Sequence, residues 1–346
     1  MDINWMINHK KSVNKRIKDA KKRIKPVKCP LCGRPLGKTC NSHSVPRMIL
    51  ETISKDGYLY NKNKVDNLEF FEQKSGINKT GTFFYICNSC DNSFFVDYEK
   101  PEAIHEPPND KMLVEIAIKN LLQKMQAKAF EKAIFKYDPI ISKLQIIVDR
   151  EAAIRTFELE YKDYEWYLQK FKRIKEKEED GEFNIIYRTV LDYEVPIAAQ
   201  ECFTIYKDRN GNMINDPNLD DSDKVQVVHF CIFPFQGKTT VLLFYYHEDS
   251  SYDILKKQFE DASDEENLKY VNYYMLALGE NYFYSAKIRD EFFTNSNLKK
   301  ISREYIGERG NFGIVSEFTK GTNYKPVKYD EIPFLLGKKY SLDTMM

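Results

Sequence analysis

Cys29-Pro-Leu-Cys32 and Cys87-Asn-Ser-Cys90 are the two stretches that decide the N-terminal fold of this chain. Each is a Cys-x2-Cys pair, which places two thiolates on one tight turn, and two pairs complete the sulfur set of a structural zinc site. Pro30 and Gly33 are turn residues that suit this geometry. We therefore predict a structural Zn²⁺ held by Cys29, Cys32, Cys87 and Cys90.

A long segment separates the two pairs, and it contains one histidine. His43 lies in Asn41-Ser-His-Ser-Val-Pro46, so a proline follows it three residues later. The other cysteines, Cys40, Cys202 and Cys231, are scattered along the chain. Paired and scattered thiols in these proportions are typical of a protein of the reducing cytoplasm with one metal site. Cys40 is either a buried thiol or an additional metal ligand.

The segment 29–99 resembles the HNH family of ββα-metal endonucleases in its zinc-stabilised form. The resemblance is carried by the two cysteine pairs, by Ser42-His-Ser-Val-Pro46 and by Asp91-Asn92. It implies that the histidine ends a strand and acts as the general base, and that the residue after the second pair binds a divalent ion. The implied site residues are His43 as general base, Asp91 as ligand of a catalytic Mg²⁺ or Mn²⁺, and Asn92 as its polar alternative.

The chemistry of these residue types suits hydrolysis of a phosphodiester. A neutral imidazole can accept a proton from water near neutral pH, and a hard cation on a carboxylate offsets the phosphate charge. The sequence departs from the family at two positions. Ser42 precedes the histidine where many members carry an acidic residue or a second histidine, and Thr82 stands where many carry asparagine. Asp97 and Glu99 are further carboxylates that the following helix could turn inward.

Both catalytic candidates also have a structural interpretation. A histidine beside a zinc knuckle can pack, donate a hydrogen bond or replace a thiolate, so His43 need not be a base. Asp91 lies at an expected helix start, where a carboxylate caps backbone N–H groups and interacts favourably with the helix dipole. The sequence leaves these alternatives open.

Residues 1–28 form a strongly basic N-terminal arm in which Asp2 and Asp19 are the acidic residues. Apolar residues recur at roughly helical spacing along it, which predicts a basic helix. Such a helix can follow the phosphates of a nucleic acid, or it can be a solvated arm.

A helical region is expected over 111–180, after the zinc module 29–105. Pro107-Pro108 ends the first region, and the spacing of apolar residues predicts a helix over Lys111–Phe135. Helical spacing continues over 138–178, with an interruption expected at Asp138-Pro139, and Gly181 is a natural stop.

Residues 182–346 are expected to form an α+β domain with an antiparallel sheet, because the apolar period changes to that of strands. Two helical stretches are expected after the strands, near Tyr252–Asp261 and Glu265–Leu278. The expected strands are Phe183–Leu191, Glu201–Lys207, Val225–Phe233 and Thr239–His247. The predicted fold class is thus α+β, with an HNH-like zinc module, a helical middle and a C-terminal antiparallel sheet with helices.

The sequence favours a metal-dependent HNH-type endonuclease that acts on nucleic acid, with DNA as the expected substrate. Residues 111–346 would be a sensing or regulatory body, and the C-terminal region could contact a protein partner or a second copy. This architecture resembles that of anti-phage defence effectors. The alternative is a non-catalytic zinc module that binds nucleic acid or protein. Without an apolar run of membrane-spanning length or a signal-peptide core, we expect a cytoplasmic protein without a membrane partner.

Overall fold

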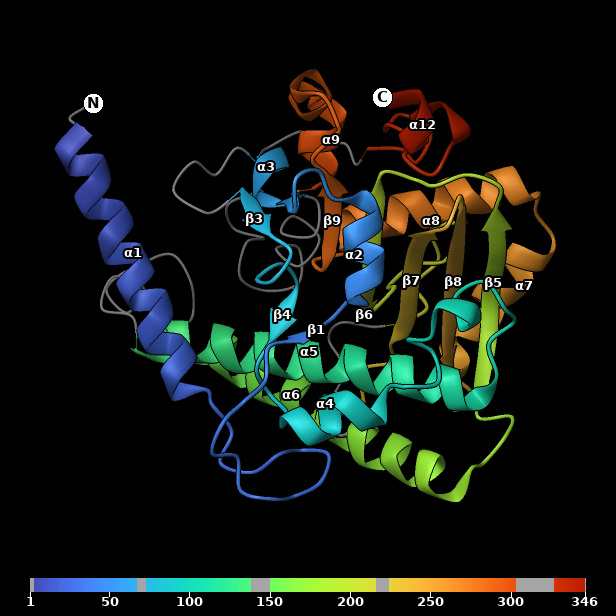
Figure 1. Ribbon diagram of the computed structural model, residues 1–346. Helices are drawn as coiled ribbons and strands as arrows, with labels where there is room; N and C mark the ends of the chain where they lie inside the picture. Colours follow the sequence, from blue (N-terminus) through green and yellow to red (C-terminus); the bar gives the residue numbers. More distant parts are fainter. Residues whose placement is uncertain (1–2, 67–72, 138–149, 216–223, 303–326, 346) are drawn as a thin grey trace.

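The computed structural model describes residues 3–66, 73–137, 150–215, 224–302 and 327–345 (Figure 1). An antiparallel sheet lies between a pair of long helices, α5 and α6, and a second helical layer formed by α7 and α8. The predicted α+β class, the helical middle and the C-terminal antiparallel sheet are confirmed. None of the helices in the described ranges carries an apolar stretch long enough to cross a bilayer.

The N-terminal part contains short elements. They are α1 (Ile3–Arg23), β1 (Ser42–His43), α2 (Arg47–Ile53), β2 (Tyr58–Asn61), α3 (Asn63–Asp66), β3 (Lys74–Gly76), β4 (Thr82–Phe83) and α4 (Asn88–Phe94). The expected basic helix is α1, which extends away from the body in Figure 1 and meets α5 at its C-terminal end.

The helical middle consists of α5 (Asp110–Tyr137) and α6 (Arg150–Lys177), which pack against each other. Helix α5 confirms the helix expected over Lys111–Phe135. Its start is capped by the Asn109 side chain, which accepts a hydrogen bond from the backbone N–H of Met112 at 3.0 Å. The expected interruption at Asp138-Pro139 lies outside the described residues. Helix α5 is buried on several sides, so three of its lysines are buried and paired with carboxylates. These pairs are Lys119 with Glu99, Lys124 with Glu201 and Glu280, and Lys128 with Glu131 and Glu160.

The C-terminal elements are β5 (Phe183–Leu191), β6 (Ile197–Phe203), β7 (Val228–Phe235), β8 (Lys238–Tyr246), α7 (Asp253–Glu260), α8 (Asp264–Leu278), β9 (Tyr282–Ser285), α9 (Ser296–Ile301) and α12 (Leu342–Met345). The expected strand Glu201–Lys207 is shifted, because pairing with β7 and β9 begins at residues 197–199. Successive residues of β7 face opposite layers: Phe230 packs with the α8 layer and Cys231 with α5.

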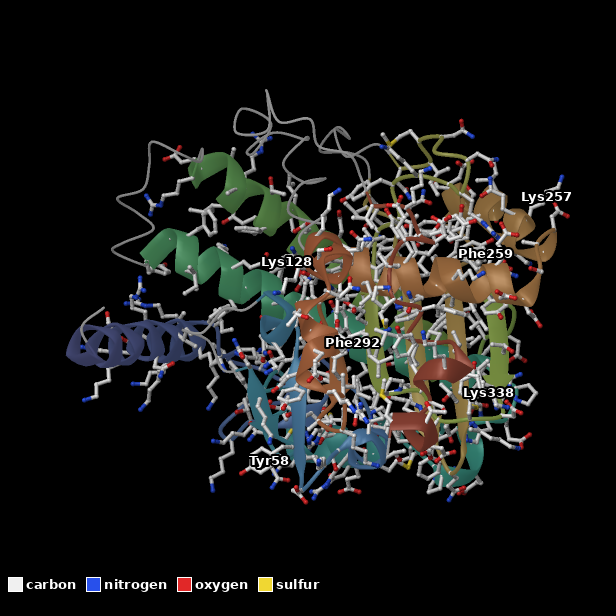
Figure 2. The ribbon with its side chains drawn as sticks, turned by 90° about the horizontal axis from the view of Figure 1, so that it is seen from above. Tyr58, Lys128, Lys257, Phe259, Phe292 and Lys338 are labelled. Carbon is white, nitrogen blue, oxygen red and sulfur yellow. The ribbon has the colours of Figure 1, made fainter. Side chains whose placement is uncertain are left out.

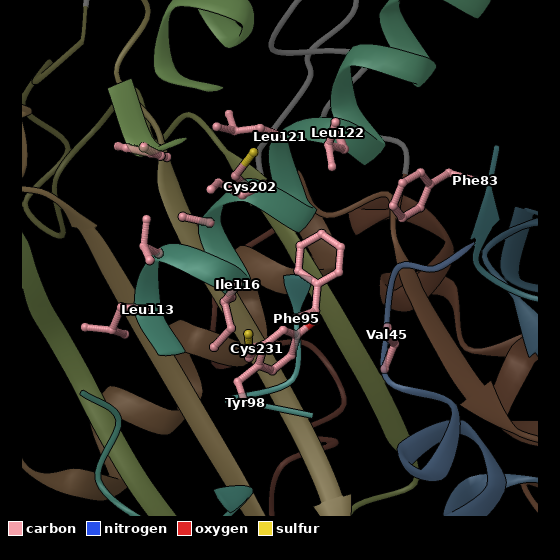
Figure 3. Packing of buried hydrophobic residues seen from close by; sticks show 14 of the residues in the cluster. Val45, Phe83, Phe95, Tyr98, Leu113, Ile116, Leu121, Leu122, Cys202 and Cys231 are labelled. Carbon is pink, nitrogen blue, oxygen red and sulfur yellow. The ribbon is translucent and has the colours of Figure 1, made fainter. Parts of the chain in front are cut away.

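The sheet includes strands from the N-terminal part of the chain. Its order is β3-β2-β9-β6-β7-β8-β5, and β2 pairs with β9 through Leu59 and Ser285. The sheet therefore crosses the boundary predicted between 29–105 and 182–346. Figure 3 shows the shared core, in which Val45 and Phe83 lie in one cluster with α5 residues and with Cys202 of the sheet.

A buried histidine lies in the same core. His229 on β7 is fully buried, with its ring stacked on Phe244 at 5.1 Å between centroids. Its Nδ1 lies 3.5 Å from the Asn120 amide nitrogen, and its Nε2 has no hydrogen-bond partner among the described residues. Burial lowers the pKa of His229 to about 3, because a charged imidazole would be desolvated without a counter-charge.

This burial predicts acid sensitivity. In the unfolded chain this histidine has a pKa of about 6.5 and becomes protonated below that pH, whereas in the folded protein it stays neutral down to about pH 3. The free energy of unfolding therefore falls as the pH drops from 6.5 toward 3. Between pH 7 and pH 5 the loss assigned to His229 is about 2 kcal/mol. Urea unfolding at both pH values should show a smaller loss for His229→Phe than for wild type. Cys231→Ala, a control in the same strand, should keep the wild-type difference; an unchanged difference in His229→Phe would contradict this assignment.

Candidate metal centre and active site

The four cysteines of the two Cys-x2-Cys pairs form one cluster. Their sulfur atoms all lie within 4.8 Å of one another. The Sγ atoms of Cys29 and Cys90 are 3.8 Å apart, and so are those of Cys32 and Cys87. A tetrahedron with Zn–S bonds of about 2.3 Å has edges of about 3.8 Å. The thiolates therefore fit a zinc ion, as the sequence predicts.

Local backbone geometry builds both knuckles. In the first, the Gly33 N–H donates to the Cys29 carbonyl at 2.8 Å, and Gly33 has a φ of +70°, which favours glycine. In the second, Cys87 is the N-cap of α4, and the Asp91 N–H donates to its carbonyl at 3.0 Å. Each pair of sulfurs is thus presented by a turn that a backbone hydrogen bond closes.

Arg34 contributes charge to the cluster. Its Nε donates to the Sγ of Cys32 at 3.4 Å, and this contact lowers the pKa of the Cys32 thiol to about 6. A depressed thiol pKa favours the thiolate, which is the form that binds metal. The guanidinium therefore offsets part of the negative charge that four thiolates bring together.

The zinc ligands frame a small ββα unit. Strand β1 pairs antiparallel with β4, with His43 opposite Thr82 and Ser42 opposite Phe83. Helix α4 is the next element after β4, and the second cysteine pair lies at its N-cap and in its first turn. Two strands and a helix are thus held beside the sulfur cluster, and His43 ends the first strand as the resemblance implied.

The His43 ring is half-buried and fixed by a backbone group. Its Nε2 lies 3.0 Å from the carbonyl oxygen of Ile77. A carbonyl oxygen can only accept, so Nε2 carries the hydrogen of this bond. In the neutral ring the other nitrogen, Nδ1, is then the basic atom. His43 is not a zinc ligand, because the sulfur cluster is complete without it.

Asp91 lies in the first turn of α4 and contacts the strand. Its Oδ1 accepts a hydrogen bond from the hydroxyl of Ser42, the residue directly before His43. The carboxylate therefore reaches β1 at the residue directly before His43. His43 and Asp91 share no hydrogen bond, so the structure brings them to neighbouring positions without joining them.

The remaining candidates lie apart from this contact. Asn92 is exposed, and it follows Asp91 on α4, where consecutive side chains do not share a face. Asp97 pairs with Lys100 at 3.6 Å, and Glu99 pairs with the buried Lys119. Cys40 is outside the sulfur cluster and donates to the Ile86 carbonyl at 3.3 Å. Burial raises the pKa of the Cys40 thiol to about 12.

Sequence reasoning missed the network that anchors the strand pair to the large sheet. The Asn281 side chain donates to the Ser44 hydroxyl at 2.8 Å, and that hydroxyl donates to the Gly81 carbonyl at 2.7 Å. The backbone N–H of Asn281 donates in turn to buried Glu201 at 3.1 Å, and Lys124 lies 3.3 Å from the same carboxylate. Burial raises the pKa of Glu201, and the positive charge of Lys124 partly offsets this rise.

Gly81 offers a test of this anchoring. It has a φ of +61°, and a Cβ there would lie 2.8 Å from the Phe283 ring and 3.0 Å from the Ser44 hydroxyl. Gly57 has a φ of +74° with nothing within 4 Å, so it is a matched control. Gly57→Ala should cost about 1 kcal/mol through backbone strain alone. Gly81→Ala should cost roughly 1–3 kcal/mol more in denaturant unfolding; equal costs would contradict the close packing.

Comparison of the chain with protein-family models, with curated proteins and with solved structures gives no match. The resemblance to HNH endonucleases therefore stays a prediction from the sequence, and the structure supports the four-cysteine cluster within it.

Proposed function

We propose that this protein is a metal-dependent HNH-type endonuclease that hydrolyses phosphodiester bonds, with DNA as substrate. One observation carries the proposal: the Ile77 carbonyl holds Nε2–H of His43, which leaves Nδ1 as the basic atom. This is the orientation that a general base needs, since the ring is fixed by one nitrogen and takes up a proton at the other. The hydroxyl of the adjacent Ser42 donates a hydrogen bond to Asp91, so a carboxylate that can bind a cation lies next to the strand that carries His43.

Asp91 would hold the catalytic Mg²⁺ or Mn²⁺, which would offset charge on the scissile phosphate. Magnesium is commonly bound through one or two carboxylates together with substrate phosphates, so a single carboxylate suits an ion that arrives with its substrate. His43 would remove a proton from the attacking water at Nδ1, and Ile77 would keep the ring in place. Asn92 remains a second polar candidate on α4.

The wider architecture supports a nuclease with a large accessory body. The basic helix α1 has lysine and arginine in its last turn and leads to the first cysteine pair, which suits contacts with phosphates. The α5–α6 pair and the sheet would sense or bind a further partner, or a second copy of the chain. A role as an anti-phage defence effector is part of the proposal and follows from this arrangement alone.

Cleavage by the purified, zinc-loaded protein tests the proposal. Supercoiled plasmid, linear duplex DNA and structured RNA would each be incubated with Mg²⁺ or Mn²⁺. We expect divalent-ion-dependent cleavage that Asp91→Ala abolishes while the zinc content stays at one per chain. Cleavage that survives Asp91→Ala, or no cleavage of any substrate with either ion, would overturn it.

A non-catalytic zinc module that binds nucleic acid is the second candidate. It is favoured by Ser42, whose hydroxyl stands in place of a second metal ligand. In the described part of the chain, the sulfur cluster is also the sole group of three or more metal-ligating residues. The double variant His43→Ala, Asp91→Ala separates the candidates. Full function of this variant in cells, with unchanged nucleic-acid affinity, would favour the module.

A further inference from the structure

A cavity of about 600 Å³ lies between the end of α1, the last turns of α5 and the first half of α6. Figure 2 shows the neighbourhood, with Lys128 on α5 and α1 projecting beside it. The segment leading to the second cysteine pair contributes Tyr85. The side chains that argue for a ligand are Arg23, Lys136, Tyr137, Phe157, Tyr161 and Lys162.

The lining is strongly cationic. Arginine and lysine contribute five side chains, and Glu158 is the one acidic residue among the lining residues. Glu158 is already paired with Lys132 at 2.7 Å. Within the described ranges, no ion pair involves Arg23, Lys136 or Lys162. Lys128 is paired with Glu131 and Glu160, so Arg23, Lys136 and Lys162 are the lining cations left to attract an anionic occupant.

The same space is lined by aromatic rings. The hydroxyls of Tyr85 and Tyr161 lie 3.2 Å apart, and Phe157 faces the Lys128 ammonium at 5.6 Å from its ring centroid. The Arg23 guanidinium lies 4.6 Å from the centroid of Tyr137. Aromatic and guanidinium planes are the groups on which nucleobases stack. The cavity volume lies within the range of about 300–1,000 Å³ that small-molecule sites occupy.

We propose that this cavity binds a nucleotide, with its phosphates on Lys136, Lys162 and Arg23 and its base against the aromatic rings. The cations of the cavity match the phosphates of a nucleotide, and its aromatic rings match the base. A free phosphate would contact the cations alone, and a free base would contact the rings alone. The proposal does not depend on the hydrolytic site, since it concerns binding by a different part of the chain.

Isothermal titration of the full-length protein with ATP, GTP, CTP and UTP at fixed ionic strength tests this site. At least one nucleotide should bind at one per chain. The matching nucleoside and inorganic triphosphate should each bind at least tenfold more weakly, because each offers one half of the contacts. Lys136→Glu and Lys162→Glu change exposed residues, so both proteins should fold, and each should weaken nucleotide binding at least tenfold.

Lys257→Glu is the matched control, because Lys257 is an exposed helical lysine on α7, remote from the cavity in Figure 2. This variant should bind the nucleotide like wild type. Absence of binding by all four nucleotides would overturn the proposal, and so would binding that the cavity variants leave unchanged. Binding of single-stranded oligonucleotides through the same lysines, without binding of free nucleotides, would overturn it in favour of a nucleic-acid channel.

Discussion

Cys90→Ser protein is expected to lose its bound zinc and much of its stability. Two of the sulfur–sulfur distances match the edge of a zinc tetrahedron, all four sulfurs lie within 4.8 Å of one another, and Cys90 is a buried member of the set. Structural zinc supplies roughly 10–16 kcal/mol in isolated zinc-finger peptides, where it is the main source of folding energy. In this protein a packed hydrophobic core also stabilises the fold. Loss of zinc should therefore lower the free energy of unfolding by several kcal/mol and the Tm by roughly 10 °C. Metal analysis and thermal unfolding measure both effects.

Cys40→Ser is the matched control for that experiment. Cys40 lies close to the knuckles in sequence and donates to the Ile86 carbonyl, which a serine hydroxyl can also do. The variant should keep one zinc per chain and a Tm near that of wild type. Zinc retained at full occupancy by Cys90→Ser, or lost from Cys40→Ser, would contradict the assigned ligand set.

His43→Ala protein is expected to lose divalent-ion-dependent cleavage by a factor of about 10²–10⁴, the usual contribution of general base catalysis. The ring is half-buried and hydrogen-bonded to the Ile77 carbonyl. Removing it should therefore leave zinc content and Tm nearly unchanged. Cleavage rates of a labelled duplex under single-turnover conditions measure the loss.

His247→Ala controls for the removal of a histidine as such. The His247 side chain is 40% exposed, follows β8 beside the edge strand β5, and lies 3.5 Å from Glu182. Its loss should leave the cleavage rate within about twofold of wild type, as expected for a surface substitution. A His43→Ala protein that cleaves at the wild-type rate would exclude His43 as the base.

The zinc cluster could be predicted because its information is local. Each Cys-x2-Cys spacing places two sulfurs on one turn, and two such turns together supply the four thiolates of a structural zinc site. The same holds for α5, which extends one residue before and two residues after the predicted range, and for β5, whose predicted ends match. Local patterns of this kind need no knowledge of distant partners.

The joining of the N-terminal strands to the sheet could not be predicted for the opposite reason. Strands β2, β3 and β9 are three or four residues long, too short for a periodic signal, and β2 meets a partner more than two hundred positions away. The Ile77 group that orients His43 is a backbone carbonyl. Every residue type has this group, so the sequence does not indicate which residue accepts the hydrogen bond. Asn281 lies far along the chain from Ser44, and its role follows from the tertiary fold alone.

If the protein is a metal-dependent nuclease as proposed, Asp91 binds a second, exchangeable cation beside the zinc-held ββα unit. Electron paramagnetic resonance of Mn²⁺ titrated into zinc-loaded protein, in the presence of a DNA duplex, tests it most directly. We predict one bound Mn²⁺ per chain in wild type and none in Asp91→Ala, with one zinc retained in both. Mn²⁺ bound equally by both proteins, or by neither, would contradict the claim.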